Sequence, residues 1–141
     1  TMANIHSGWK GTVKRIGEKA IDKLQKNYGV KTQNLICCFG PCIHKDHFLV
    51  NSDVSEIFEL EFPEECKKFE IVEETEYENE KGKQYRIDTV KLNRELFKKM
   101  GLLEENIIDS GLCTVCRSDI FHSRRAEGPE YQSNASLMML K

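Results

Sequence analysis

The chain has 141 residues, a mass of 16.3 kDa and a formal net charge of −2 at pH 7. Hydrophobic residues make up 39% and charged residues 31%, which is the usual balance of a soluble globular protein and predicts a single domain over residues 1–141. The sequence has no run of roughly 20 apolar residues, so we expect no membrane partner. Its pI near 6.1 argues against a nucleic-acid partner.

The first elements predicted along the chain are a strand, a helix and a second strand. Residues 1–6 have a strand pattern that is already under way at the first residue, which indicates either a missing amino-terminal part or a native start at Met2. A helix follows over about residues 12–28 and stops at Gly29. Residues 34–39 predict a buried strand that ends in a glycine-proline turn.

The middle of the chain is strongly acidic. A helix capped by Asn51 or Ser52 is closed by Pro63. Residues 56–80 hold eleven of the 23 acidic side chains, and their alternation predicts two edge strands joined by a turn at residues 79–82. A charge run of this kind is typical of a solvated surface hairpin.

The last third of the sequence predicts one more helix and two strands. The helix begins at Asp88 or Thr89 and ends at Gly101, and the strands cover residues 106–109 and 135–140. Strands and helices alternate without a regular unit. The expected fold class is therefore α+β, with mixed α/β layers in which helices pack on a sheet.

The six cysteines are expected to stay reduced. Cys37 and Cys38 lie in an apolar run, where free cysteine behaves as a small buried hydrophobe. A chain of this length does not need disulfides to hold its core, and no secretory signal precedes them. We therefore expect a cytoplasmic protein.

His6 is the first residue with chemical potential. It stands at the end of the opening strand, just before Ser7, Gly8 and a helix start, where an imidazole can ligate zinc or act as a general base. The helix start and Lys10 favour an anion such as phosphate. The alternative for His6 is a partly buried, hydrogen-bonded side chain.

A CxxC pair and two polar loops are weaker candidates. Cys113 and Cys116 are either redox-active or half of a zinc site, but His122 leaves that site one ligand short, so the residues alone favour Cys113 as a packed core residue. Polar residues 44–47 either line a pocket or form a solvated loop. The late loop offers a hydroxyl and two guanidinium groups, from Ser123, Arg124 and Arg125. These groups either bind phosphate or nucleoside oxygens or form surface ion pairs.

Five ordered motifs resemble one known family. The sequence H-S-G-W-K-G-T at residues 6–12 resembles the H-A-G-W-[RK]-G-T signature of the YfiH family, long called multicopper polyphenol oxidoreductase or laccase domain and now regarded as purine nucleoside phosphorylases. The later matches are Gly40-Pro41-Cys42-Ile43, Ile87-Asp88 through Asn93-Arg94-Glu95-Leu96, Ile108 to Cys113-Thr114, and Phe121 to Arg125. The resemblance covers the whole chain but only the carboxy-terminal half of the family. It implies a CNF1/YfiH-like fold, truncated at its amino end.

The resemblance implies a zinc-dependent purine nucleoside phosphorylase. Such an enzyme converts adenosine, inosine, guanosine or methylthioadenosine and phosphate to free base and ribose 1-phosphate, and also deaminates adenosine. Family members bind zinc through an upstream histidine and cysteine plus the histidine of the signature, so His6 is the implied metal ligand and the other two have no counterpart here. Substrate or phosphate binding is expected of Lys10, Ser123, Arg124 and Arg125.

Departures from the family leave two points open. His47-Phe48-Leu49-Val50 replaces the family's C-Y-E-V, which loses an acidic side chain, and the alignment does not decide between Arg124 and Arg125. Copper is the alternative metal, for oxidation of phenols, but laccase chemistry needs a histidine-rich array that four histidines do not supply. The other alternative is an inactive fragment or a binding module.

Overall fold

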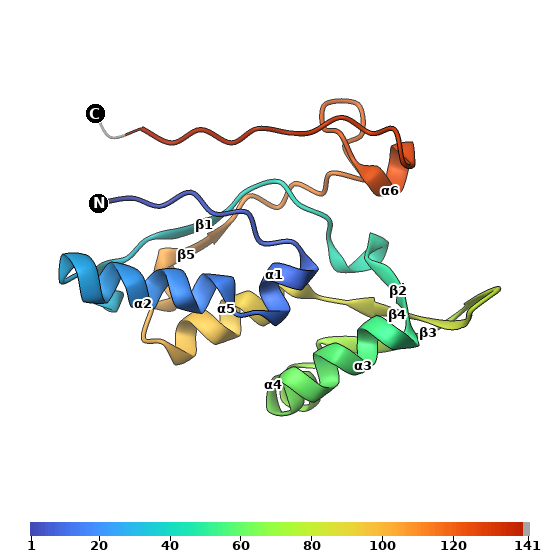
Figure 1. Ribbon diagram of the computed structural model, residues 1–141, viewed down its shortest axis with the longest axis horizontal. Coiled ribbons are helices and arrows are strands. Elements are labelled where there is room, and N and C mark those ends of the chain that lie inside the picture. Colours follow the sequence, from blue (N-terminus) through green and yellow to red (C-terminus); the bar gives the residue numbers. More distant parts are fainter. Residues whose placement is uncertain (140–141) are drawn as a thin grey trace.

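The structure, a computed structural model, describes residues 1–139 as two small sheets covered by helices (Figure 1). Two parallel strands, β1 (Cys37–Phe39) and β5 (Ile107–Asp109), form the first sheet. The second sheet is antiparallel and has the order β2 (Leu49–Asn51), β4 (Gly82–Ile87), β3 (Val72–Asn79). Mixed helices with both kinds of strand pairing confirm the α+β class.

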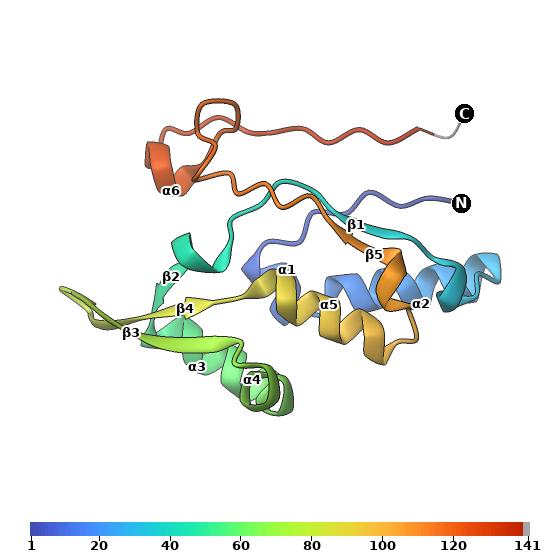
Figure 2. The ribbon, with the colours of Figure 1, turned by 180° about the vertical axis from the view of Figure 1, so that it is seen from behind.

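Helices cover one side of each sheet. They are α1 (Trp9–Val13), α2 (Ile16–Tyr28), α3 (Ser52–Glu61), α4 (Pro63–Phe69), α5 (Thr89–Lys99) and α6 (Arg124–Glu127). Three single-turn 3₁₀ helices lie between them, at Thr32–Asn34, Lys45–His47 and Glu104–Asn106. In Figures 1 and 2, α2 and α5 lie beneath β1 and β5, whereas α3 packs on the antiparallel sheet and α4 packs against α3 and α5. Among the described helices, none is both long and apolar enough to cross a membrane.

The core lies where the helices meet the two sheets. Phe58 and Phe62 stand one turn apart on α3 and its end, and both are fully buried. Ile87 from β4 and Leu92 from α5 are also fully buried and belong to the same cluster. Phe39 of β1 stacks on Phe97 of α5, with ring centroids 5.8 Å apart. This stack joins the parallel sheet to the helix layer.

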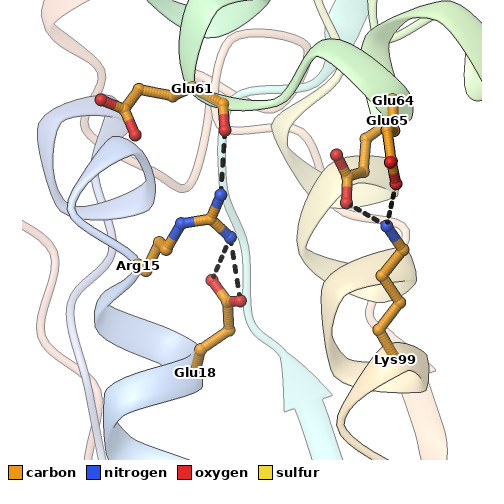
Figure 3. A network of polar contacts seen from close by, with 6 residues as sticks. All are labelled: Arg15, Glu18, Glu61, Glu64, Glu65 and Lys99. Carbon is orange, nitrogen blue, oxygen red and sulfur yellow. Dashed lines mark hydrogen bonds and ion pairs between the residues drawn. The ribbon is translucent and has the colours of Figure 1, made fainter.

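The helix predicted over residues 12–28 is two helices. It begins earlier, at Trp9, and breaks at Arg15, whose φ of 58° places it in the left-handed region. The guanidinium compensates for this strain, because it donates to the Glu61 carbonyl oxygen and pairs with Glu18 (Figure 3), and it lies 4.5 Å from the centroid of the Phe62 ring. Tertiary contacts to the end of α3 therefore decide where the helix breaks.

The two terminal strands expected from the sequence are not formed. Residues 1–8 have no regular secondary structure, and neither have residues 129–139, while Leu140 lies outside the described residues. The two segments run side by side in both ribbon views, but the hydrogen bond that joins them is from the Asn4 side chain to the Ser136 carbonyl oxygen. A strand needs a ladder of backbone hydrogen bonds, which these segments do not make with each other.

Two local predictions in the first two-thirds of the chain are wrong, and a third is incomplete. The helix before Pro63 ends at Glu61, close to its predicted end, but Pro63 also begins a second helix, α4, at its first position, where proline lacks only an N–H that has no intrahelical partner. Cys38 is exposed and Cys37 half-buried, because β1 is covered on one side only. The hairpin strands β3 and β4 are joined at residues 79–82 as predicted, but β4 is central because β2 pairs with its other edge.

Candidate functional site

The H-S-G-W-K-G-T segment is an extended approach followed by the first turn of α1. Gly8 is the N-cap, and its carbonyl oxygen accepts a hydrogen bond from the Thr12 N–H at 2.9 Å. The buried Thr12 hydroxyl lies 3.0 Å from the Ser7 hydroxyl and accepts from the Asn93 side chain at 3.4 Å. Asn93 also donates to the Thr89 carbonyl oxygen. The segment is thus fastened to α5 by two residues from separate family-like motifs.

His6 lies at the exposed start of this segment. Its Nε2 is 3.3 Å from the place that a Cβ on Gly8 would occupy, so a larger residue at position 8 would press on the imidazole. Within residues 1–139, His6 belongs to no group of three or more His, Cys, Asp or Glu side chains with ligand atoms close enough to share a metal ion. Residues 1–139 therefore do not by themselves assemble a three-ligand metal centre around His6.

The loops that follow β1 and β5 meet at one edge of the parallel sheet. Because the strands are parallel, their carboxyl ends point the same way, which is where binding residues gather in such sheets. The backbones of Cys42 and Cys113 form an isolated parallel β-bridge, and both cysteines are free thiols. In this bridge the Cys42 N–H donates to the Leu112 carbonyl oxygen, and the Thr114 N–H donates to the Cys42 carbonyl oxygen. These bonds bring the polar residues of the first loop beside the CxxC pair of the second.

His47, Cys113 and Cys116 form the group of metal-ligating side chains in the described chain (residues 1–139). The His47 Nδ1 atom is 3.6 Å from the Cys113 sulfur and 3.7 Å from the Cys116 sulfur. Cys113 is buried, as expected, but its sulfur faces the other two residues rather than apolar core. Burial raises the pKa of the Cys113 thiol, and the backbone N–H groups of Cys116, His44 and Val115 outweigh this effect and lower it to about 7.

The sequence associated the wrong histidine with the CxxC pair. The His122 Nδ1 atom lies 3.0 Å from the Glu127 carboxylate, and the Asn134 side chain bonds both the N–H and the carbonyl of His122. His47 is the partner instead. Its signal was the polar run after the glycine-proline turn, but only the pairing of the two loops shows that this run reaches Cys113.

A cavity of about 430 Å³ lies beside this cluster. Its lining carries both charge signs and consists of His44, Lys45, Asp46, Asp88, Val90, Lys91, Arg94 and Asp109. Residues 44–46 therefore line a pocket, which was one of the two interpretations of that loop. The His44 Nε2 atom is buried without a hydrogen-bond partner among the described residues. Arg94 is held in place by the Ile107 carbonyl oxygen and Glu104.

Lys10 lies on a different element from the other predicted binding residues, Ser123, Arg124 and Arg125. The Arg125 side chain donates to the Leu49 carbonyl oxygen at 2.7 Å, and burial lowers its pKa. Ser123 is buried at the N-cap position of α6, and Arg124 is exposed. The Lys10 ammonium lies over the Trp9 ring, 5.4 Å from its centroid. Within residues 1–139, Lys10 makes no hydrogen bond or ion pair with residues 123–125.

Comparisons with known proteins agree on one family. The family model described as multi-copper polyphenol oxidoreductase laccase matches residues 1–141. The purine nucleoside phosphorylase YlmD of Bacillus subtilis is 28% identical over 122 residues, which are 86% of this chain and 41% of that protein. The adenosine deaminase RL5 of an unknown prokaryotic organism is 28% identical over 127 residues, 90% of this chain and 45% of that protein.

Solved structures show the same relationship. The crystal structure of the hypothetical protein YfiH from Bacillus licheniformis superposes with a TM-score of 0.70 and 27% identity, and the match covers 86% of this chain and 43% of the other. YlmD from Geobacillus stearothermophilus also gives a TM-score of 0.70, with 25% identity. The chain therefore spans less than half the length of each of these four relatives.

Proposed function

This chain belongs to the family of multi-copper polyphenol oxidoreductase laccases, and on that basis we propose that it carries part of the site of a purine nucleoside phosphorylase that also deaminates adenosine. The observation that carries the proposal is the match of the family model to residues 1–141, together with the names of the relatives. Several of these relatives are named purine nucleoside phosphorylase. Relatives with that name, and one named adenosine deaminase, support a purine nucleoside as the substrate class.

Phosphorolysis defines what the residues must do. An oxygen of inorganic phosphate attacks the anomeric carbon of the ribose while the glycosidic bond to the purine breaks, and the purine leaves with the bonding electrons and takes up a proton. The site must therefore hold a multiply charged anion next to the sugar and stabilise negative charge on the departing base. Cationic side chains that are not already engaged by the protein are the ones suited to this role.

Two cations meet that condition better than the third. Lys10 is exposed at the first turn of α1, and its ammonium contacts the face of the Trp9 ring rather than a carboxylate of the protein. Arg124 is exposed as well. The Arg125 guanidinium already donates to the backbone of β2, which makes it a positioning residue for the loop in this proposal. Ser123 is buried, its backbone N–H donates to the Glu127 carboxylate, and its side chain makes no capping hydrogen bond to α6.

A zinc requirement for this activity rests on the family resemblance. It assigns His6 as one of three ligands, and within residues 1–139 His6 belongs to no group of three or more metal-ligating side chains. Phenol oxidation, which the family description also names, is the second candidate. The His/Cys group found within residues 1–139 contains a single histidine, whereas several coppers need a histidine-rich array.

The test is a chromatographic assay of the purified chain with adenosine or inosine, with and without phosphate. Free base formed only in the presence of phosphate is the expected product, and inosine formed from adenosine without phosphate would report the deaminase. Oxygen uptake with a phenol and no base release would favour the oxidase. Absence of every product would contradict a sufficient site within these residues alone and favour a binding module.

The assay gains resolution from a matched pair of lysine variants. We expect Lys10→Ala to raise the KM for phosphate by about tenfold or more, the size of one charge-assisted hydrogen bond. Lys14, exposed at the other end of α1, provides the control, and Lys14→Ala is expected to leave that KM unchanged. Equal values for the two variants would remove Lys10 from the phosphate site.

A further inference from the structure

We propose that His47, Cys113 and Cys116 bind a zinc ion that fastens the loop after β1 to the loop after β5. The two loops come from distant parts of the sequence and are already paired through the backbone β-bridge between Cys42 and Cys113. Ligand atoms of all three residues lie within 4.8 Å of one another, so one ion can contact all of them. This site is separate from the position of His6 and does not rest on the proposed nucleoside chemistry.

The spacing of the ligand atoms agrees with tetrahedral zinc. Zinc binds cysteine sulfur at about 2.3 Å and histidine nitrogen at about 2.0–2.1 Å, and a tetrahedral angle between two such bonds places sulfur and nitrogen about 3.6 Å apart. The two distances from the His47 Nδ1 atom are 3.6 Å to Cys113 and 3.7 Å to Cys116. The three side chains therefore need little rearrangement to share an ion.

The donor set favours zinc over hard cations. Two sulfurs and one imidazole nitrogen are soft or borderline ligands, whereas magnesium and calcium are bound through oxygen. Thiolates are the binding form, so zinc displaces the proton of each cysteine that is still protonated, and His47 binds as the neutral imidazole.

The site has room for a fourth ligand on its outer side. Cys116 is exposed and His47 half-buried, so solvent reaches the cluster from the side opposite the buried Cys113. A water molecule or a small ligand would complete the tetrahedron there. The six described cysteines are free thiols, which leaves both sulfurs of the pair available to the metal.

Zinc at this position would also hold one wall of the neighbouring cavity. His44, Lys45 and Asp46 line the cavity and immediately precede His47, and Asp109 lines it just before the loop that leads to Cys113. Cross-linking the two loops would restrict the relative motion of these four side chains. The metal is thus expected to order a binding surface rather than to bind substrate itself.

The test is zinc binding by the purified full chain after removal of metal with a chelator. We expect one zinc per chain by elemental analysis and a rise in melting temperature on adding zinc. Cobalt added in place of zinc is expected to give the thiolate-to-metal charge-transfer absorption that cysteine ligands produce. His47→Gln and Cys116→Ser are each expected to weaken zinc binding by at least about 100-fold, because loss of even an outer-shell partner weakens metal binding about 10–100-fold.

Two matched variants separate this site from other sources of zinc. Cys38→Ser removes an exposed cysteine outside the cluster, and His6→Gln removes the histidine of the signature, so both are expected to keep full zinc affinity. Far-ultraviolet circular dichroism establishes that each variant is folded. Zinc that is lost in His6→Gln but kept in Cys116→Ser would overturn the proposal. So would a chain that binds no zinc, or one in which thiol titration shows Cys113 and Cys116 joined as a disulfide.

Discussion

Replacement of Gly17 by alanine is expected to destabilise the protein, although alanine is the better helix former. Gly17 lies in the first turn of α2 and faces α5. A Cβ at this position would lie 2.5 Å from both the Cε1 and Cζ atoms of Phe97, whereas carbon atoms in contact are about 3.5–4.0 Å apart. The ring would have to retreat by about 1 Å or more.

The surroundings of Phe97 decide the sign of the effect. Its side chain is buried and its ring is stacked on Phe39, so it cannot move away from α2 without disturbing the contact that joins α5 to β1. Overpacking of this kind costs about 1–3 kcal/mol, and the helix preference of alanine over glycine returns about 1 kcal/mol. We therefore expect a net loss of about 1 kcal/mol, which is roughly 3 °C in Tm for a chain of this size.

Urea unfolding followed by the fluorescence of Trp9 measures this loss. Trp9 is the single tryptophan and packs against the core, so its emission reports the folded state. The control is the double variant Gly17→Ala/Phe97→Leu compared with Phe97→Leu alone, since the shorter side chain removes the ring atoms that the Cβ would meet. In that background the alanine is expected to stabilise the protein. Stabilisation by Gly17→Ala in the wild-type background would refute the packing argument.

Two further predictions concern polar contacts at helix ends. Asp88 accepts a hydrogen bond from the Lys91 N–H as the N-cap of α5, so Asp88→Ala is expected to lower the free energy of unfolding by about 1 kcal/mol in urea titrations, and Asp88→Asn by much less because asparagine also caps. Burial raises the pKa of the Glu65 carboxyl, but the hydrogen bond from Lys99 at 2.5 Å outweighs it, so the pKa lies below its usual value (Figure 3). The stability from this pair is therefore present above the unfolded-state pKa and lost as the pH falls through the lowered folded-state pKa. Glu65→Gln should cost about 1 kcal/mol at neutral pH and flatten the acid limb of a Tm-against-pH curve; a limb as steep as that of the wild type would contradict this.

Much of the fold was readable from local patterns. The hairpin turn at residues 79–82, the capped helix that begins after Asp88 and the strand Ile107–Asp109 all follow from signals within a few residues. The failures share one cause. The break at Arg15 depends on contacts with α3, and residues 1–6 have strand-forming side chains without a neighbouring backbone ladder.

The candidate site was predictable only in part. The signature around His6 identified the family, and the structure adds that Thr12 of this signature is bonded to Asn93 of another motif. The role of His6 as a metal ligand and of Lys10 as a phosphate ligand stay predictions. The sequence analysis missed the group that His47 forms with the CxxC pair, because His47 and Cys113 are 66 residues apart in the sequence.

The sequence by itself determined the family, the class of fold and the helices and turns whose signals are local, because capping, periodicity and turn chemistry act between neighbouring residues. Tertiary structure alone decided which loops meet. Parallel pairing of β1 with β5 turns the loops after both strands to the same edge, and this places His47 against Cys113 and Cys116. Strand pairing between distant segments depends on contacts that no local pattern contains, and the metal-ligating cluster arises from it.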